Sequence, residues 1–154
     1  MRGYILAGGR SSRFGSDKAL HVVDGEMLVV RTARVLAEAG LEPVVIARQG
    51  RHLPILELME PSDRSNHPLW GVAMALSFGD DAFITPVDLP ELSASTIRSL
   101  VEARAIAAGQ PLLGVFPAEL AARAIAFAEE DRPVYEFVAG LPTLDVGSIL
   151  NLNR

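Results

Sequence analysis

The stretch LAGGRSSRFGSDKAL, residues 6–20, joins the first apolar run of the chain to a polar loop. The run from Arg2 to Ala7 is apolar without alternation and stops at two glycines, which is typical of a short buried strand. Gly8 and Gly9 have no Cβ, so the backbone there can turn sharply and bring its N–H groups close to a ligand. Successive exposed N–H groups form a concave site suited to anions, so this loop predicts an anion site at the end of a strand.

Three cationic side chains surround the same loop: Arg10, Arg13 and Lys18, the last being the only lysine of the chain. Ser11, Ser12 and Ser16 add hydroxyl donors. A glycine turn ringed by solvated arginines is the simpler interpretation, but three cations within eleven residues favour a polyphosphate ligand. The two commonest phosphate motifs do not fit. A Walker A loop would have lysine directly after its second glycine, but Gly15 is followed by Ser16 and Asp17, and no G-x-G-x-x-G is present.

Predicted strands and helices alternate from the start of the chain, which is the pattern of βαβ units on a mostly parallel sheet. We therefore expect one three-layer α/β/α, Rossmann-like domain over residues 1–154. Ligands of such sheets bind beyond the carboxyl ends of the strands, and both Gly8–Lys18 and Pro86–Pro90 follow a predicted strand. The predicted strands are Arg2–Ala7, Pro43–Ala47, Ala82–Val87 and Leu112–Phe116, with two short ones within Thr143–Leu152. The predicted helices are Met27–Ala39, Pro68–Phe78, Ser93–Ala108, Ala118–Glu129 and Val134–Ala139, and Arg48–His67 is predicted to be mostly loop.

The segment PVDLP, residues 86–90, places Asp88 at the end of a buried strand between two prolines. The prolines stiffen the backbone and remove competing N–H donors. Magnesium takes one or two carboxylates together with substrate phosphates and water, so Asp88 is a candidate metal ligand. A turn aspartate that caps the following helix is the alternative interpretation of the same residue.

The composition excludes several classes of function. The formal net charge of −5 argues against a broad nucleic-acid surface, and the absence of cysteine excludes thiolate catalysis and cysteine-ligated metals. The three histidines lack metal-ligand spacing. The apolar opening is too short for a signal peptide or a membrane span, so we expect a cytoplasmic protein without membrane or nucleic-acid partners.

Residues 6–20 resemble the signature loop of the MobA-like molybdenum cofactor guanylyltransferases, which is close to L-A-G-G-x-S-x-R-M-G-x-D-K. Phe14 replaces the methionine, and related cytidylyltransferases tend to have alanine-glycine in place of Gly8-Gly9, which favours guanine over cytosine. The resemblance implies that a terminal phosphate of molybdopterin attacks the α-phosphorus of magnesium-bound GTP and that pyrophosphate leaves. The matching positions are Leu6, Ala7, Gly8, Gly9, Ser11, Arg13, Gly15, Asp17 and Lys18.

The resemblance also implies roles for individual residues. Arg13 and Lys18 would neutralise the triphosphate, and Asp88, which matches a P-x-D-x-P element, would bind Mg²⁺; these three form the implied catalytic set. The family's G-P-L-x-G element appears as HPLWG, residues 67–71, so that His67 stands in place of the glycine and is predicted to cap the helix that follows. The acid that contacts the base is either Glu60 or Asp63. The implied nucleotide-binding residues are Leu6, Ala7, Gly8, Gly9, Arg10, Ser11, Arg13, Lys18, Glu60, Asp63, Gly71 and Asp88.

The acceptor side of the implied site is less well defined. Asn151 and Asn153 resemble a family N-x-N element near the metal and the pterin, and a polar strand end is the alternative. The chain is short for the family between residues 101 and 120, which belongs to the acceptor side. Two other hypotheses therefore remain: a cytidylyl- or sugar-phosphate nucleotidyltransferase, and a non-catalytic nucleotide-binding module. The implied partners are GTP, molybdopterin and other proteins of molybdenum cofactor synthesis.

Overall fold

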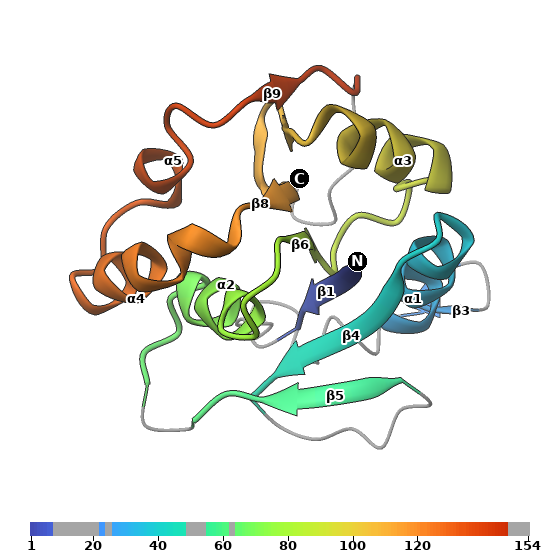
Figure 1. Cartoon of the computed structure of the whole chain (residues 1–154). Helices are drawn as coiled ribbons and strands as arrows, with labels where there is room; N and C mark the ends of the chain where they lie inside the picture. The colour runs from blue at the N-terminus through green and yellow to red at the C-terminus, as the bar shows by residue number, and fades with distance from the viewer. Residues whose placement is uncertain (8–21, 24–25, 49–54, 62–63, 148–154) are drawn as a thin grey trace.

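The structure is a computed structural model that describes residues 1–7, 22–23, 26–48, 55–61 and 64–147. Its centre is a seven-stranded sheet in the order β5-β4-β1-β6-β8-β7-β9 (Figure 1). A short antiparallel pair, β2 (Val22–Val23) and β3 (Glu26–Met27), precedes the first helix. The strands of the main sheet are β1 (Arg2–Leu6), β4 (Glu42–Ala47), β5 (Leu56–Met59), β6 (Ala82–Pro86), β7 (Ile106–Ala107), β8 (Gln110–Phe116) and β9 (Thr143–Leu144).

Four neighbouring strands of the sheet run parallel, namely β5, β4, β1 and β6. Leu6 pairs with both Ile46 and Pro86, and Ala47 pairs with Met59, so the four strands end at nearly the same level. Strand β8 is antiparallel to β6 and to β7, and β9 is parallel to β7. The sheet is therefore mostly parallel, as predicted, and the residues that follow β1, β4, β5 and β6 gather at one edge.

Helices cover both faces of the sheet and form the outer two of three layers (Figure 1). Successive side chains of a strand point to opposite faces, so Ile5 packs in one core and Tyr4 in the other. The core that contains Ile5 is closed by α1 (Leu28–Glu38) and α3 (Ala94–Ala103). The core that contains Tyr4 is closed by α2 (Leu69–Leu76), α4 (Ala121–Glu129) and α5 (Val134–Phe137), and a 3₁₀ turn, η3 (Ala118–Leu120), leads into α4.

Among its described residues, the segment from Arg48 to His67 contains one regular element, the edge strand β5, which the sequence did not predict. Leu56 and Met59 are half exposed, so the strand shows no apolar run from which it could be identified. Its backbone is held by pairing with β4, whose central residues are fully buried. Tertiary pairing therefore overrides a weak local pattern here.

The prediction for the helix after Ser93 was right at its start and wrong at its end. Ser93 Oγ accepts a hydrogen bond from the Thr96 N–H at 3.1 Å and caps α3. The helix stops at Ala103, five residues before the predicted end, because Arg104 adopts a left-handed conformation with φ of 51°. The chain then reverses through β7, which pairs with β8 across Gly109.

The other predicted elements agree with the structure to within a few residues. Pro68 precedes α2 and is not its first residue, and α5 ends at Phe137. One of the two short strands expected in Thr143–Leu152 is β9, and residues 148–152 lie outside the described part of the chain. Within the described ranges, each helix is too short or too polar to cross a membrane.

Candidate active site

Three of the predicted site residues, Ala7, Glu60 and Asp88, lie within two residues of the ends of parallel strands, at the carboxyl edge of the sheet. The Ala7 N–H donates to the Ile46 carbonyl at 2.8 Å, which holds the end of β1 against β4. The Glu60 N–H donates to the Ala47 carbonyl at 2.8 Å, which fixes the residue after β5 in the same way. Asp88 follows the end of β6 by two residues. The fold thus brings together residues that are up to 81 positions apart in sequence.

Gly71 brings the first turn of α2 against this edge. An added Cβ would stand 2.8 Å from Leu6 Cδ2, 3.6 Å from Ile46 Cγ2 and 3.8 Å from Glu60 Oε2. Glycine therefore lets the helix approach the ends of β1 and β4 more closely than a larger residue would. The same distances place the Glu60 carboxylate beside α2 and the end of β1.

The Glu60 carboxylate lies between opposing electrostatic effects. Partial burial raises its pKa because the charged form loses solvation, while the positive charges of Arg48 and Arg64 act to lower it. Burial is the larger effect, so Glu60 holds its proton more tightly than an ordinary glutamate. A carboxylate of this kind favours a ligand that donates hydrogen bonds to it.

Arg48 and Arg64 were not predicted as site residues, and both shape the surroundings of Glu60. The Arg48 guanidinium donates to the Ser65 carbonyl at 3.0 Å and also to the Arg64 carbonyl and the Asn66 side chain. The Arg64 guanidinium lies 4.5 Å from the centre of the Trp70 ring. Arg48 directly follows β4, so its position after a parallel strand is the signal that could have identified it.

Asp88 is a buried carboxylate, with 9% of its surface exposed, between the buried side chains of Val87 and Leu89. The turn that carries it is tied to α1, because the Arg31 Nε–H donates to the Pro90 carbonyl at 2.7 Å. No group of three or more potential ligands is found among the described residues. A single carboxylate that is completed by substrate phosphates and water fits the ligand preference of Mg²⁺, and the chemistry of Asp88 agrees with it.

His67 caps α2, as predicted, although it does so from the position before Pro68. Its Nδ1 accepts a hydrogen bond from the Leu69 N–H at 3.1 Å, and its carbonyl accepts one from the Trp70 N–H at 3.2 Å. The first N–H groups of the helix are therefore satisfied within the chain.

The remaining predicted residues cannot be placed in this arrangement. Of the two candidate acids for the base contact, Glu60 lies in the described part of the chain and Asp63 does not. The predicted residues that lie outside the described part of the chain are Gly8, Gly9, Arg10, Ser11, Arg13, Lys18, Asp63, Asn151 and Asn153. Their roles stay predictions.

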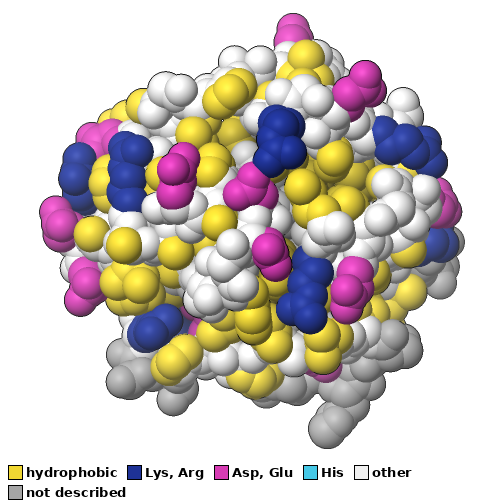
Figure 2. Space-filling model, viewed as in Figure 1, with side chains coloured by type: hydrophobic (Ala, Val, Ile, Leu, Met, Phe, Trp, Pro, Cys, Tyr) yellow, Lys and Arg dark blue, Asp and Glu magenta, His cyan; other side chains and the backbone are white. Residues whose placement is uncertain are grey.

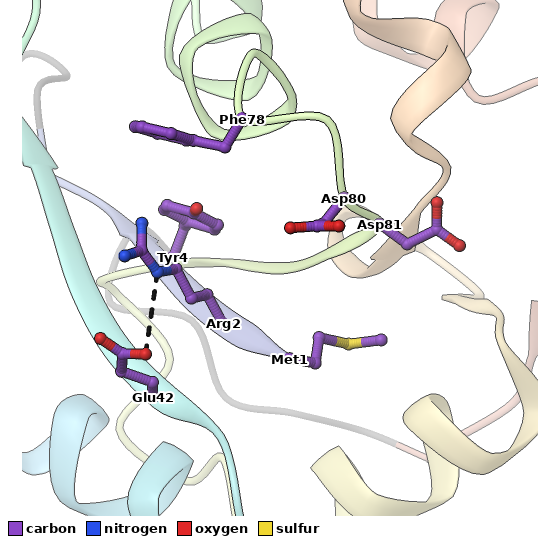
Figure 3. Close-up of a pocket in the computed structure, with 7 residues that line it drawn as sticks. All are labelled: Met1, Arg2, Tyr4, Glu42, Phe78, Asp80 and Asp81. Carbon is purple, nitrogen blue, oxygen red and sulfur yellow. Dashed lines mark ion pairs between the residues drawn. The ribbon is translucent and has the colours of Figure 1, made fainter.

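A pocket of about 560 Å³ lies at the opposite, amino-terminal edge of the sheet (Figure 3). Its charges are largely paired within the fold: Arg2 lies 3.7 Å from Glu42, and Asp81 pairs with Arg104. The face shown in Figure 2 likewise carries interspersed acidic and basic side chains. We therefore regard this pocket as a packing feature of the strand starts. It is lined by Met1, Arg2, Tyr4, Glu42, Phe78, Asp80 and Asp81.

The fold and the site together define an α/β protein of the nucleotidyltransferase class. The family model described as the MobA-like NTP transferase domain matches residues 3–141, and the chain belongs to that family. A relative from Opitutus terrae, named as a probable molybdenum cofactor guanylyltransferase, is 33% identical over 92% of this chain and 79% of its own length. A molybdenum cofactor guanylyltransferase from Xanthomonas euvesicatoria is 35% identical over 64% of this chain, which spans only 52% of that relative.

Solved structures show the same fold at low sequence identity. Molybdopterin-guanine dinucleotide biosynthesis protein A from Archaeoglobus fulgidus has a TM-score of 0.75 at 15% identity, over 94% of this chain and 82% of that one. A 2-C-methyl-D-erythritol 4-phosphate cytidylyltransferase from Thermus thermophilus has a TM-score of 0.67 at 14% identity, over 100% of this chain and 94% of that one. A manganese complex of a Mycobacterium tuberculosis protein has a TM-score of 0.69 at 15% identity, over 98% of this chain and 91% of that one. The fold by itself therefore does not distinguish guanine from cytosine.

Proposed function

We propose that residues 1–154 form a single guanylyltransferase domain that transfers GMP from GTP to molybdopterin and releases pyrophosphate. The observation that carries the proposal is the position of Glu60, whose carboxylate lies beside Gly71 and the end of β1 in a chain of the MobA-like family. The names of the Opitutus and Xanthomonas relatives support the same activity.

Glu60 would distinguish the base. The Watson–Crick edge of guanine presents two donors, N1–H and N2–H, that a single carboxylate can accept together. The same edge of cytosine presents one donor, N4–H, beside the acceptors N3 and O2, so a carboxylate there could accept only one hydrogen bond and would face an acceptor unfavourably. Glu60, or Asp63 in its place, therefore favours GTP over CTP.

The triphosphate would lie against the loop that follows β1. The N–H groups of Gly8 and Gly9, with the charges of Arg13 and Lys18, would bind its oxygens, and Arg10 and Ser11 would add donors. A phosphate oxygen of molybdopterin forms the new bond to the α-phosphorus. The bond from the α-phosphorus to the bridging oxygen breaks, and pyrophosphate leaves with the electron pair. The protein contributes positioning and charge stabilisation to this exchange.

Asp88 would hold the divalent cation that the reaction uses. Mg²⁺, when bound, supplies charge neutralisation of the phosphate oxygens. Asp88 would present its carboxylate oxygens close to the end of β6, which pairs with the end of β1. Asn151 and Asn153 are proposed to contact the acceptor, and other proteins of molybdenum cofactor synthesis are proposed to deliver it.

Calorimetry with GTP, CTP and ATP in the presence and absence of Mg²⁺, followed by a pyrophosphate-release assay with molybdopterin, tests this function. We expect GTP to bind at least about tenfold more tightly than CTP, since each charge-assisted hydrogen bond contributes about 1.5–3 kcal/mol. A preference for CTP would favour a cytidylyltransferase instead. GTP binding without pyrophosphate release would favour a non-catalytic nucleotide-binding module.

Glu60→Gln should change nucleotide affinity and stability in opposite directions. The amide cannot accept both guanine donors, so GTP should bind about 10- to 100-fold more weakly. The folded protein should become more stable at neutral pH, because the pKa of Glu60 is raised and the mutation removes a charge that folding disfavours. Below the ordinary glutamate pKa the carboxyl is protonated in both states, so the gain in stability should vanish there.

Urea unfolding at neutral and acidic pH and calorimetry with GTP measure the two effects. Glu129→Gln, an exposed change at the end of α4, is the matched control and should alter neither quantity. Unchanged GTP affinity in Glu60→Gln would assign the base contact to another residue, with Asp63 as the next candidate.

A further inference from the structure

His67 uses both ring nitrogens, and each bonds to a different part of the chain. Nδ1 accepts from the Leu69 N–H at 3.1 Å. Nε2 lies 2.6 Å from the Arg132 carbonyl oxygen. A nitrogen that accepts carries no proton, so the bonded ring is the neutral tautomer with its proton on Nε2, which donates to Arg132.

The Nδ1 bond fixes the start of α2. Leu69 is the first residue of the helix, and Gly71 on the same turn lies against Leu6 and Glu60. The start of a helix has unpaired N–H groups, and a turn whose donor has lost its acceptor frays more readily. A displacement of this turn would move the backbone that borders Glu60.

The Nε2 bond reaches the turn between α4 and α5, 65 residues away in sequence. That turn is itself well anchored, because the Arg132 guanidinium lies 4.0 Å from the centre of the Phe127 ring and its Nη2 lies 3.2 Å from the Glu136 carboxylate. The imidazole of His67 therefore bonds to the anchored α4–α5 turn through Nε2 and to the first turn of α2 through Nδ1.

We propose that His67 is a positioning residue for the nucleotide: braced on the Arg132 carbonyl, it holds the first turn of α2 and so sets the position of Gly71 beside Glu60. This inference rests on the proposed function and deepens it. The residue stands where the related motif has glycine, a residue that could make neither side-chain bond. His67 itself does not touch the reacting atoms; it acts through α2.

Asparagine and glutamine separate the two bonds. The Oδ1 of asparagine is bonded to Cγ, as Nδ1 of histidine is, so His67→Asn keeps an acceptor for the Leu69 N–H and loses the reach to Arg132. The terminal amide of glutamine is one bond further out, so His67→Gln keeps a donor for the Arg132 carbonyl and loses the cap. The two variants have similar polarity and no charge, which makes each the control for the other.

Steady-state kinetics with GTP and hydrogen exchange of the Leu69 amide test the proposal on the full chain. His67→Gln should raise the KM for GTP about three- to tenfold with kcat unchanged, as expected for loss of a helix cap that contributes equally to ground and transition states. Its Leu69 amide should exchange faster by a similar factor. His67→Asn keeps the cap and loses only the brace on Arg132, so it should raise KM and the Leu69 exchange rate by a smaller factor, about twofold.

The outcomes that would overturn the proposal differ from those that would overturn the function. If the natural protein binds no GTP, the proposed function fails and this inference fails with it. If the natural protein binds GTP but the two variants do not differ in KM, or if kcat falls instead, the role of His67 alone is refuted. The imidazole ¹⁵N shifts of the natural protein give a test that needs no variant to fold, and a proton on Nδ1 would refute the proposed cap.

Discussion

Asp88→Asn should lower Mg²⁺-dependent pyrophosphate release by about 100- to 1000-fold, the usual effect of removing one group that stabilises developing charge. The side chain is buried at the end of β6 and keeps its shape in the amide, while its negative charge is lost. Asparagine is a weaker ligand for Mg²⁺, which prefers carboxylate oxygens. The rate should therefore fall although the protein stays folded and its base site stays intact.

The measurement is the rate of pyrophosphate release across a Mg²⁺ titration, together with thermal unfolding of the same preparation. Asp80→Asn is the control, because Asp80 is an exposed carboxylate at the opposite edge of the sheet (Figure 3). It should leave the rate unchanged. If Asp88→Asn loses activity only in proportion to the fraction unfolded, Asp88 is a structural aspartate of the turn and not a metal ligand.

Gly114→Ala should destabilise the fold by about 3 kcal/mol or more, from backbone strain and overpacking together. Gly114 has a φ of +148°, a conformation that other residues rarely adopt. An added Cβ would stand 2.4 Å from the Ala105 carbonyl oxygen and 2.6 Å from Ile106 Cα. Both are backbone atoms of the segment that pairs with β8, so no side-chain rotation can relieve the contact.

Urea unfolding of Gly114→Ala and of Gly109→Ala separates the two contributions. Gly109 also has a positive φ, +81°, but nothing lies within 4 Å of the position of its Cβ. Its substitution should cost only about 1–2 kcal/mol, the strain of the left-handed conformation. Equal losses in the two variants would mean that the β7–β8 pairing moves apart at little cost, contrary to this expectation.

The sequence predicted the elements whose side chains are fully buried. Strands such as β1, β4 and β6 are short apolar runs because both their faces are covered, and such runs are visible without any structure. The edge strand β5 has half-exposed residues at both ends and gave no such signal. The apolar residues after α3, Ala105, Ile106 and Ala107, suit the buried face of a helix as well as a buried strand. The sequence pattern therefore could not separate the end of α3 from β7.

The candidate site divides in the same way. Asp88 could be predicted as a candidate ligand because the pattern is local: a carboxylate close to the end of a buried strand, between two prolines. The surroundings of Glu60, including the charges of Arg48 and Arg64, required the structure. Glu60 meets Gly71 only through the packing of α2 on the sheet.

By itself, the sequence determined the alternation of buried strands and amphipathic helices, the polar residues that follow the strands, and the resemblance of residues 6–20 to a nucleotide loop. The tertiary structure alone decided that Glu60 and Gly71 lie together and that His67 joins α2 to Arg132. Strand and helix patterns depend on neighbours a few residues apart, whose spacing the chain dictates. Contacts such as that of His67 with Arg132 join residues 65 positions apart, and their geometry exists only once the helices have packed on the sheet.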